Sequence, residues 1–251
     1  NVWCAAGKGT FGTEEIIRRV AATRLGEIVS HRTLIVPQLG APGVSAHKVK
    51  KGCGFAVVYG PVRAADVRSF LATGMEAAAD MRRVTFPTLE RLALTPVELT
   101  VILAKPAKWL ALALFLAAGV GPGFFSLSAA WSRGLDAGAA CLAGVAAGAI
   151  ATPVLLPWLP WKAFWLKGAV AGGVLAILLI LWNGANLGTL ESLALLLAVT
   201  AVASYCAMNF TGATPYTSPS GVEKEMRRAL PLQAGAAALA AVAWLASAFV
   251  A

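Results

Sequence analysis

The sequence predicts an α/β domain followed by an all-α membrane domain of about five transmembrane helices. The 251 residues are 58% hydrophobic and 13% charged, whereas soluble domains carry about 25% charged residues. Residues 1–108 hold 15 Lys or Arg and 8 Asp or Glu, and residues 109–208 hold only three basic and two acidic residues. Strand-like and helix-like segments alternate in the first part alone. We therefore expect two domains, over residues 1–104 and 105–251.

The first predicted element is a helix from Thr13 to Leu25. Two glutamates, Glu14 and Glu15, stand in its first turn, and Arg18 and Arg19 follow four residues later. Acidic residues favour the positive N-terminal end of the helix dipole, and acid-to-base pairs four residues apart stabilise exposed helices. This order of charges therefore supports the helix.

Two short apolar runs are predicted to be strands, and each is followed by a predicted helix. The strands are Thr33–Val36 and Phe55–Tyr59, and the helices are 43–51, ended by Gly52, and 64–73, ended by Gly74. A glycine directly after a helix is typical of a C-terminal cap. Alternating helices and continuous apolar strands indicate a parallel sheet that is covered on both faces.

The residues at the ends of the two strands are candidate ligand-binding residues. In parallel α/β sheets, ligands bind outside the carboxyl ends of the strands. The candidates at these ends are Gln38, Leu39, Gly40, Tyr59, Gly60 and Pro61. Their glycines would let a cofactor approach the backbone closely. The alternative interpretation is that these are ordinary turn residues.

Five apolar segments of the second domain are predicted to cross a membrane. The spans are about 109–130, 137–156, 167–183, 190–208 and 229–250. A spanning helix needs about 20 apolar residues, so the third span is short. Gly-Val-Gly-Pro at 119–122 predicts a kink or an early end of the first span. The run of small residues at 143–148 favours close helix packing.

The basic residues near the spans predict the orientation of the membrane domain. Seven lie on one side, namely Lys105, Lys108, Lys162, Lys167, Lys224, Arg227 and Arg228, and Arg133 alone lies opposite. Lys and Arg are enriched in cytoplasmic loops. We therefore expect a multi-pass protein of the cytoplasmic membrane, with the N-terminal domain in the cytoplasm and the C-terminus outside. The polar stretch 209–228 would be a cytoplasmic loop on which the N-terminal domain docks.

The net charge of +9 raises the question of a nucleic-acid partner. Nucleic-acid binding is not expected, because basic and aromatic residues are not interleaved along the chain. Attraction of the basic domain to the anionic cytoplasmic leaflet explains the excess of basic over acidic residues. The four cysteines form no C-x-x-C pair, so neither a disulfide framework nor a zinc ribbon is expected.

The most informative segment for function is the first octapeptide, Asn1-Val2-Trp3-Cys4-Ala5-Ala6-Gly7-Lys8. A Cys4 thiolate is a soft ligand that suits a soft or borderline transition metal. The small residues after it would let a large flat cofactor approach the backbone. The alternative is that Cys4 is a small buried hydrophobic residue, as free cysteines usually are. Residues 7–12 also fit G-x-G-x-x-G, but that nucleotide-binding motif requires a preceding strand.

The octapeptide resembles the cap-helix motif of the corrinoid proteins that methylate mercury, the HgcA family, whose pattern N-V/I-W-C-A-A/G-G-K it matches at every position. The resemblance continues through 31–33, 36–43 and 58–63. It implies a Rossmann-like corrinoid-binding domain, similar to that of the corrinoid iron-sulfur protein of the acetyl-CoA pathway. It also implies cobalamin held base-off, with the Cys4 thiolate as the lower axial ligand of cobalt. The implied cofactor-binding residues are the octapeptide and the six strand-end candidates.

The function that this resemblance implies is a corrinoid-dependent methyltransferase. It would transfer a methyl group from cobalt to Hg(II) and give methylmercury. The implied partners are a small ferredoxin-like protein with two 4Fe-4S clusters, which re-reduces cobalt, and a methyl donor linked to tetrahydrofolate. The chain lacks an initiator Met and begins inside the motif. We therefore expect an N-terminally truncated domain whose upstream strands are missing.

Two other functions are compatible with parts of the sequence. A corrinoid methyl carrier of an acetyl-CoA-type pathway is disfavoured by the five predicted spans and by the lack of a four-cysteine cluster motif. A membrane transporter or sensor with a small cytoplasmic domain is the second alternative. Transport paths usually carry paired ionisable residues within the spans, and here only Glu191 lies near the end of a span. Bound cobalamin would distinguish the corrinoid protein from the transporter.

Overall fold

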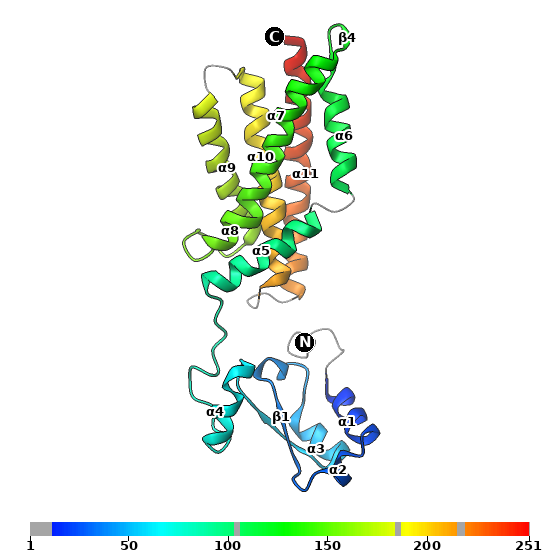
Figure 1. Cartoon of the computed structure of the whole chain (residues 1–251), viewed down its shortest axis with the longest axis vertical. Coiled ribbons are helices and arrows are strands. Elements are labelled where there is room, and N and C mark those ends of the chain that lie inside the picture. The colour runs from blue at the N-terminus through cyan, green and yellow to red at the C-terminus, as the bar shows by residue number, and fades with distance from the viewer. Residues whose placement is uncertain (1–11, 103–105, 184–186, 215–218, 251) are drawn as a thin grey trace. The chain divides into compact units, whose positions relative to one another are not determined.

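The chain folds into two compact units, Asn1–Thr85 and Phe86–Ala251 (Figure 1). The computed structural model describes residues 12–102, 106–183, 187–214 and 219–250. The division falls after Thr85, whereas the sequence placed the domain boundary after residue 104. The residues between these two positions include the helix α5 (Thr88–Ile102), which packs on helices of the second unit. Each unit is described by itself below.

The first unit contains a pair of parallel strands joined through a helix. Its elements are α1 (Thr13–Ala22), α2 (Leu25–Ile28), β1 (Thr33–Val36), the 3₁₀ turn Gln38–Gly40, α3 (Ala46–Cys53), β2 (Ala56–Tyr59), the 3₁₀ turn Ala64–Asp66 and α4 (Val67–Ala72). Strand β1 pairs with β2 in parallel, with Val36 opposite Tyr59. The two predicted strands and their parallel arrangement are therefore confirmed.

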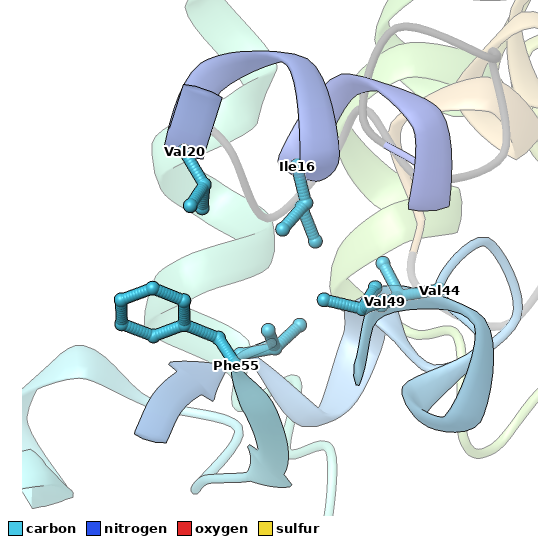
Figure 2. Packing of buried hydrophobic residues seen from close by; sticks show 6 residues of the cluster. Ile16, Val20, Val44, Val49 and Phe55 are labelled. Carbon is cyan, nitrogen blue, oxygen red and sulfur yellow. The ribbon is translucent and has the colours of Figure 1, made fainter. Parts of the chain in front are cut away.

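The hydrophobic core of the first unit lies between one face of the strands and the helices α1 and α3. Ile16 and Val20 project from α1 toward Val44, Val49 and Phe55 (Figure 2). Ile16 and Val20 are four residues apart, so they lie on the same face of α1. Burial of this apolar face drives the packing of α1 on α3.

A Rossmann fold is not shown for this unit. Among the described residues of this unit, the sheet has two strands. Ile35 remains partly exposed, which shows that the second face of the sheet is less covered than predicted. The predicted helix 13–25 is interrupted where Arg24 adopts a left-handed conformation. Helix α3 is capped by Gly54, whose φ is +77°, and not by Gly52 as predicted. Gly52 lies within α3, where an added Cβ would come within 2.4 Å of the Ile17 side chain.

The second unit is a bundle of helices with short connections. Its elements are α5 (Thr88–Ile102), α6 (Pro106–Ala118), β3 (Val120–Gly121), β4 (Phe124–Phe125), α7 (Leu127–Val145), the π-helical segment Ala146–Ala151, α8 (Thr152–Val154), α9 (Phe164–Asn183), α10 (Thr189–Phe210), the 3₁₀ turn Thr211–Ala213 and α11 (Pro219–Val250). Helices α6, α7, α9, α10 and α11 run alongside one another, and α5 crosses one end of the bundle (Figure 1). The predicted loop 209–228 is shorter in the structure, because α10 extends to Phe210 and α11 begins at Pro219.

In the described part of this unit, four helical segments are long and apolar enough to cross a membrane, namely Leu127–Val154, Phe164–Trp182, Thr189–Phe210 and Ser220–Val250. The predicted span 109–130 is not one helix. Its helix α6 ends at Ala118, and an antiparallel hairpin of β3 and β4 separates it from α7. The early end predicted at 119–122 is confirmed. The 13 residues of α6 rise only about 20 Å, which is less than the roughly 30 Å of hydrocarbon in a bilayer.

Exposed tryptophans lie near both ends of the bundle. Trp158 and Trp161 follow α8, and Trp182 lies in the last turn of α9. The 18 residue steps of α9 from Phe164 to Trp182 correspond to about 27 Å, close to the thickness of the hydrocarbon layer. Tryptophans are enriched at both membrane–water interfaces. Their spacing, together with the four long apolar helices, indicates a membrane protein.

Helix α10 is the centre of the bundle, and glycines allow its neighbours to approach it closely. Gly144 and Gly148 contact it from α7 and the π-helical segment, and Gly168 and Gly172 contact it from α9. Small residues at helix interfaces permit the close packing that replaces the hydrophobic effect inside a membrane. The packing role predicted for the run 143–148 is therefore confirmed.

Candidate functional site

The octapeptide Asn1–Lys8, with Cys4 at its centre, lies outside the residues that the structure describes. The structure therefore shows the part of the predicted site that follows the two strands. In the described residues, no group of three or more His, Cys, Asp or Glu side chains could hold a metal ion.

The residues after β1 form a 3₁₀ turn, Gln38–Gly40, that begins at Pro37. The Gly40 amide donates to the Pro37 carbonyl over 2.8 Å, and Gly40 is buried. Leu39 is partly exposed beside it. The Gln38 side-chain oxygen Oε1 is buried and has no hydrogen-bond partner among the residues that the structure describes. A buried acceptor without a partner is costly, so this amide is the strongest sign of a ligand at the strand ends.

The residues at the end of β2 are engaged within the unit. The Tyr59 hydroxyl donates to the Val44 carbonyl over 2.6 Å, and the Gly60 amide donates to the Val36 carbonyl over 2.8 Å. A Cβ on Gly60 would lie 2.8 Å from the Ile35 side chain, so only glycine fits there without a shift. Pro61 is fully buried. These contacts hold the two strand ends together at one edge of the sheet.

Thr13 attaches the start of α1 to the loop that follows β1. Its amide donates to the Gly43 carbonyl over 3.2 Å, and its hydroxyl accepts from the Ser45 amide over 2.9 Å. Cys4 precedes Thr13 by nine residues, and an extended chain of that length reaches at most about 30 Å. Thr13 is therefore held against the loop that follows β1, which also carries Gln38. No local sequence pattern predicts this role of Thr13, because its partners lie 30 and 32 residues away.

The first turns of α1 carry a cluster of exposed ion pairs. Glu15 accepts hydrogen bonds from Arg19 over 2.8 Å and from Arg18 over 2.9 Å. These two guanidinium groups hold the pKa of the Glu15 carboxyl below its ordinary value. The carboxyl therefore stays ionised near neutral pH, and the order of charges predicted to favour this helix is confirmed.

Two of the three cysteines that the structure describes, Cys53 and Cys206, are engaged in packing, and the third, Cys141 of α7, is half-buried. The Cys53 thiol donates to the Val49 carbonyl over 3.2 Å within α3. Cys206 is buried against Val145 and Ala149. Cysteines in such settings behave as small hydrophobic residues. Neither therefore competes with Cys4 as a candidate ligand.

Two ionisable side chains of the second unit form hydrogen bonds with backbone groups at the ends of helices. The Glu225 carboxylate of α11 accepts from the Trp165 amide in the first turn of α9 over 2.7 Å. The Lys167 ammonium donates to the Leu156 carbonyl, just beyond α8, over 2.6 Å. Free amides at helix N-termini and free carbonyls at C-termini need such partners. These contacts give both side chains a structural role.

A cavity of about 250 Å³ opens at the β3–β4 end of the bundle, and Arg133 and Glu191 line it. Both charged groups already have partners. Glu191 accepts from the Gly188 amide over 3.1 Å, and Arg133 donates to the Ala118 carbonyl and to the Ser247 hydroxyl, each over 3.3 Å. We therefore assign no ligand to this cavity.

Comparison of the chain with protein-family models, with curated proteins and with solved structures gives no match. The assignment of a function therefore depends on the residues themselves: the octapeptide around Cys4, the strand ends that carry Gln38, and the membrane-spanning bundle.

Proposed function

We propose that this protein is a corrinoid-dependent methyltransferase that transfers a methyl group from cobalt to Hg(II). The observation that carries the proposal is the octapeptide Asn1–Lys8, in which one cysteine follows a tryptophan and precedes three small residues. Thiolates are ligands for soft and borderline metals, and Hg(II) is a soft electrophile. The proposed partners remain a ferredoxin-like protein with two 4Fe-4S clusters and a tetrahydrofolate-linked methyl donor.

The strand ends fit a corrinoid in two respects. The corrin ring carries amide side groups, and such a group could supply the hydrogen bond that the buried Oε1 of Gln38 lacks among the described residues. Leu39, partly exposed next to Gln38, offers apolar surface to the ring. Tyr59, Gly60 and Pro61 would contribute by holding the edge of the sheet in place, because their polar and apolar groups pack inside the unit.

In the proposed reaction, individual residues of the chain would bind and orient the corrinoid. The bound corrinoid supplies a transferable methyl group on its cobalt. Cys4 would hold the cobalt through its thiolate, and Gln38 would orient the ring through one of its amide groups. Thr13 holds the start of α1 on the loop that carries Gln38. Hg(II) is the substrate and leaves as methylmercury.

Cobalamin binding by the purified full chain tests this proposal. The parent protein is expected to change the absorption spectrum of added cobalamin. Gln38→Leu removes the amide, and we expect cobalamin affinity to fall about threefold to tenfold, the effect of one hydrogen bond. Gln233→Leu is the matched control, because Gln233 also has a buried, unpartnered Oε1 but belongs to α11 of the membrane unit.

An unchanged cobalamin spectrum with the parent chain would contradict the proposal and favour the transporter or sensor. A corrinoid methyl carrier of an acetyl-CoA-type pathway would also bind cobalamin. Formation of methylmercury from Hg(II) separates these two corrinoid functions, because a methyl carrier has no need to accept Hg(II).

The proposed orientation puts the N-terminal unit and the α8–α9 connection in the cytoplasm. It predicts opposite labelling of two exposed positions on either side of the single crossing Leu127–Val154. In a chain without its native cysteines, Gly123→Cys should react with an impermeant maleimide in sealed cells. Lys162→Cys should react only after the membrane is permeabilised, because basic loops stay inside. The reverse pattern would invert the topology, and equal reactivity of both positions would contradict the crossing itself.

A further inference from the structure

Helix α5 has an unusual distribution of polar and apolar residues. Its exposed face carries Leu89 and Leu92, with exposed fractions of 78% and 46%. Its inward face carries Leu94 and Leu99, which pack against apolar clusters of the bundle, together with Arg91 and Thr95, whose exposed fractions are 4% and 5%. Large apolar side chains on the exposed face and buried polar ones on the inward face are unusual for a surface helix of a soluble protein. The exposed leucines therefore indicate that this side of α5 contacts lipid chains.

Arg91 is buried, and the described part of the chain places no counter-charge beside it. Its Nη2 donates to the Thr88 hydroxyl over 2.8 Å, and its Nε is buried with no partner among the described residues. It forms no ion pair with any residue in the described ranges. A guanidinium group has five N–H donors, and a buried charge without a partner is strongly unfavourable. The site therefore lacks a negatively charged acceptor.

Two further groups at the same place would favour an anion. The buried Thr95 hydroxyl has no partner within the described ranges and lies four residues after Arg91, on the same face of α5. The first backbone bond of α5 runs from the Arg91 amide to the Pro87 carbonyl. The amides before Arg91 therefore lie at the positive end of the helix, where oxyanions bind. Thr88 is exposed, so the guanidinium that contacts it lies just below the surface.

The position of α5 matches the depth of lipid headgroups. Helix α5 packs against α8 and the π-helical segment at the end of the bundle (Figure 1). The exposed Trp158 and Trp161 directly follow α8, and such tryptophans mark the membrane–water interface. Phosphate groups of phospholipids lie at this level, and their chains extend toward the apolar surface.

We propose that Arg91, together with Thr88 and Thr95, forms a binding site for the phosphate group of a phospholipid. The lipid chains cover Leu89 and Leu92, and the phosphate supplies the acceptor oxygens that the buried guanidinium lacks. Arginine suits this role because its planar fork binds two phosphate oxygens at once. The lipid thus joins α5 to the rest of the bundle.

Three probes distinguish a phospholipid from a free anion and from apolar contact alone. Delipidated full-length protein in a neutral maltoside detergent is titrated with dioctanoyl-phosphatidylglycerol, with dioctanoylglycerol, which has no phosphate, and with inorganic phosphate. Native mass spectrometry gives bound probe, and thermal melting gives the shift in Tm. We expect the phospholipid to bind about tenfold or more tighter than either of the other probes, and to raise Tm.

Equal binding of dioctanoylglycerol would show that only apolar contact matters and would overturn the proposal. Equal binding of inorganic phosphate would overturn the lipid assignment in favour of a free anion. Both results come from the parent protein, so they do not depend on the folding of any variant.

Substitutions at the site locate the binding. Arg91→Gln is expected to weaken phosphatidylglycerol binding about tenfold or more, the effect of losing a charged hydrogen bond. Arg91→Lys keeps the positive charge but not the planar guanidinium group. Its affinity for phosphatidylglycerol should therefore lie between those of Arg91→Gln and the parent protein. Arg228→Gln is the matched control, since Arg228 is an exposed arginine of α11. Unchanged binding in Arg91→Gln, or an equal loss in Arg228→Gln, would contradict this location.

Discussion

Replacing Cys4 by alanine is expected to lower the formation of methylmercury by more than about 100-fold. Loss of residues that merely support a metal ligand already costs about 10- to 100-fold in affinity or activity, and here the proposed ligand itself is removed. Alanine has no side-chain donor for cobalt, so no other atom of residue 4 can replace the sulfur. The measurement is methylmercury produced from Hg(II) by membranes that contain equal amounts of each variant.

Cys53→Ala is the matched control for this experiment. The Cys53 thiol is half-buried and donates only to the Val49 carbonyl of its own helix, so its loss should leave methylation within about twofold of the parent, as expected for a contact worth a few tenths of a kcal/mol. Membrane insertion should be unchanged in both variants. Substantial methylation by Cys4→Ala would show that the reaction does not need Cys4. The main support for the proposed function would then be lost.

Replacing Gly168 by alanine is expected to destabilise the membrane unit by about 3 kcal/mol, near the upper end of the usual cost of overpacking. An added Cβ would lie 2.4 Å from the Ala207 Cβ and 2.5 Å from the Ala203 carbonyl oxygen of α10. Both neighbours are attached directly to the α10 backbone, so neither can rotate away. Helices α9 and α10 would have to separate, and each would lose contacts along the interface.

Gly138→Ala is the matched control, because Gly138 is also a helical glycine but no atom lies within 4 Å of its added Cβ. There alanine should stabilise α7 by up to about 1 kcal/mol through its better helix propensity. The free energy of unfolding is measured in mixed micelles by titration with a denaturing detergent, with helicity as the signal. Equal stability of the two variants would show that α9 and α10 are not closely packed at Gly168.

Local sequence patterns predicted most of the secondary structure. The alternation of apolar runs and glycines located β1, β2 and the cap of α4 at Gly74, because these features depend on neighbouring residues. Gly-Val-Gly-Pro at 119–122 marked the end of α6 for the same reason. The six strand-end candidates lie at the ends of β1 and β2, but the sequence did not distinguish their roles. Spacing alone does not show that the Tyr59 hydroxyl is engaged by Val44 while the Gln38 oxygen is left unpartnered.

The sequence by itself determined that a basic α/β segment precedes apolar helices, because charge, hydropathy and strand propensity are properties of the local chain. Only the tertiary structure decided where α5 belongs and what its polar face does. Arg91 and Thr95 look like surface residues in the sequence, and their burial depends on helices at least 50 residues away. The same holds for Thr13, which is held by a loop 30 residues later, and for Gly168, whose neighbours lie on α10. Packing between distant segments decides such features, and no local pattern records it.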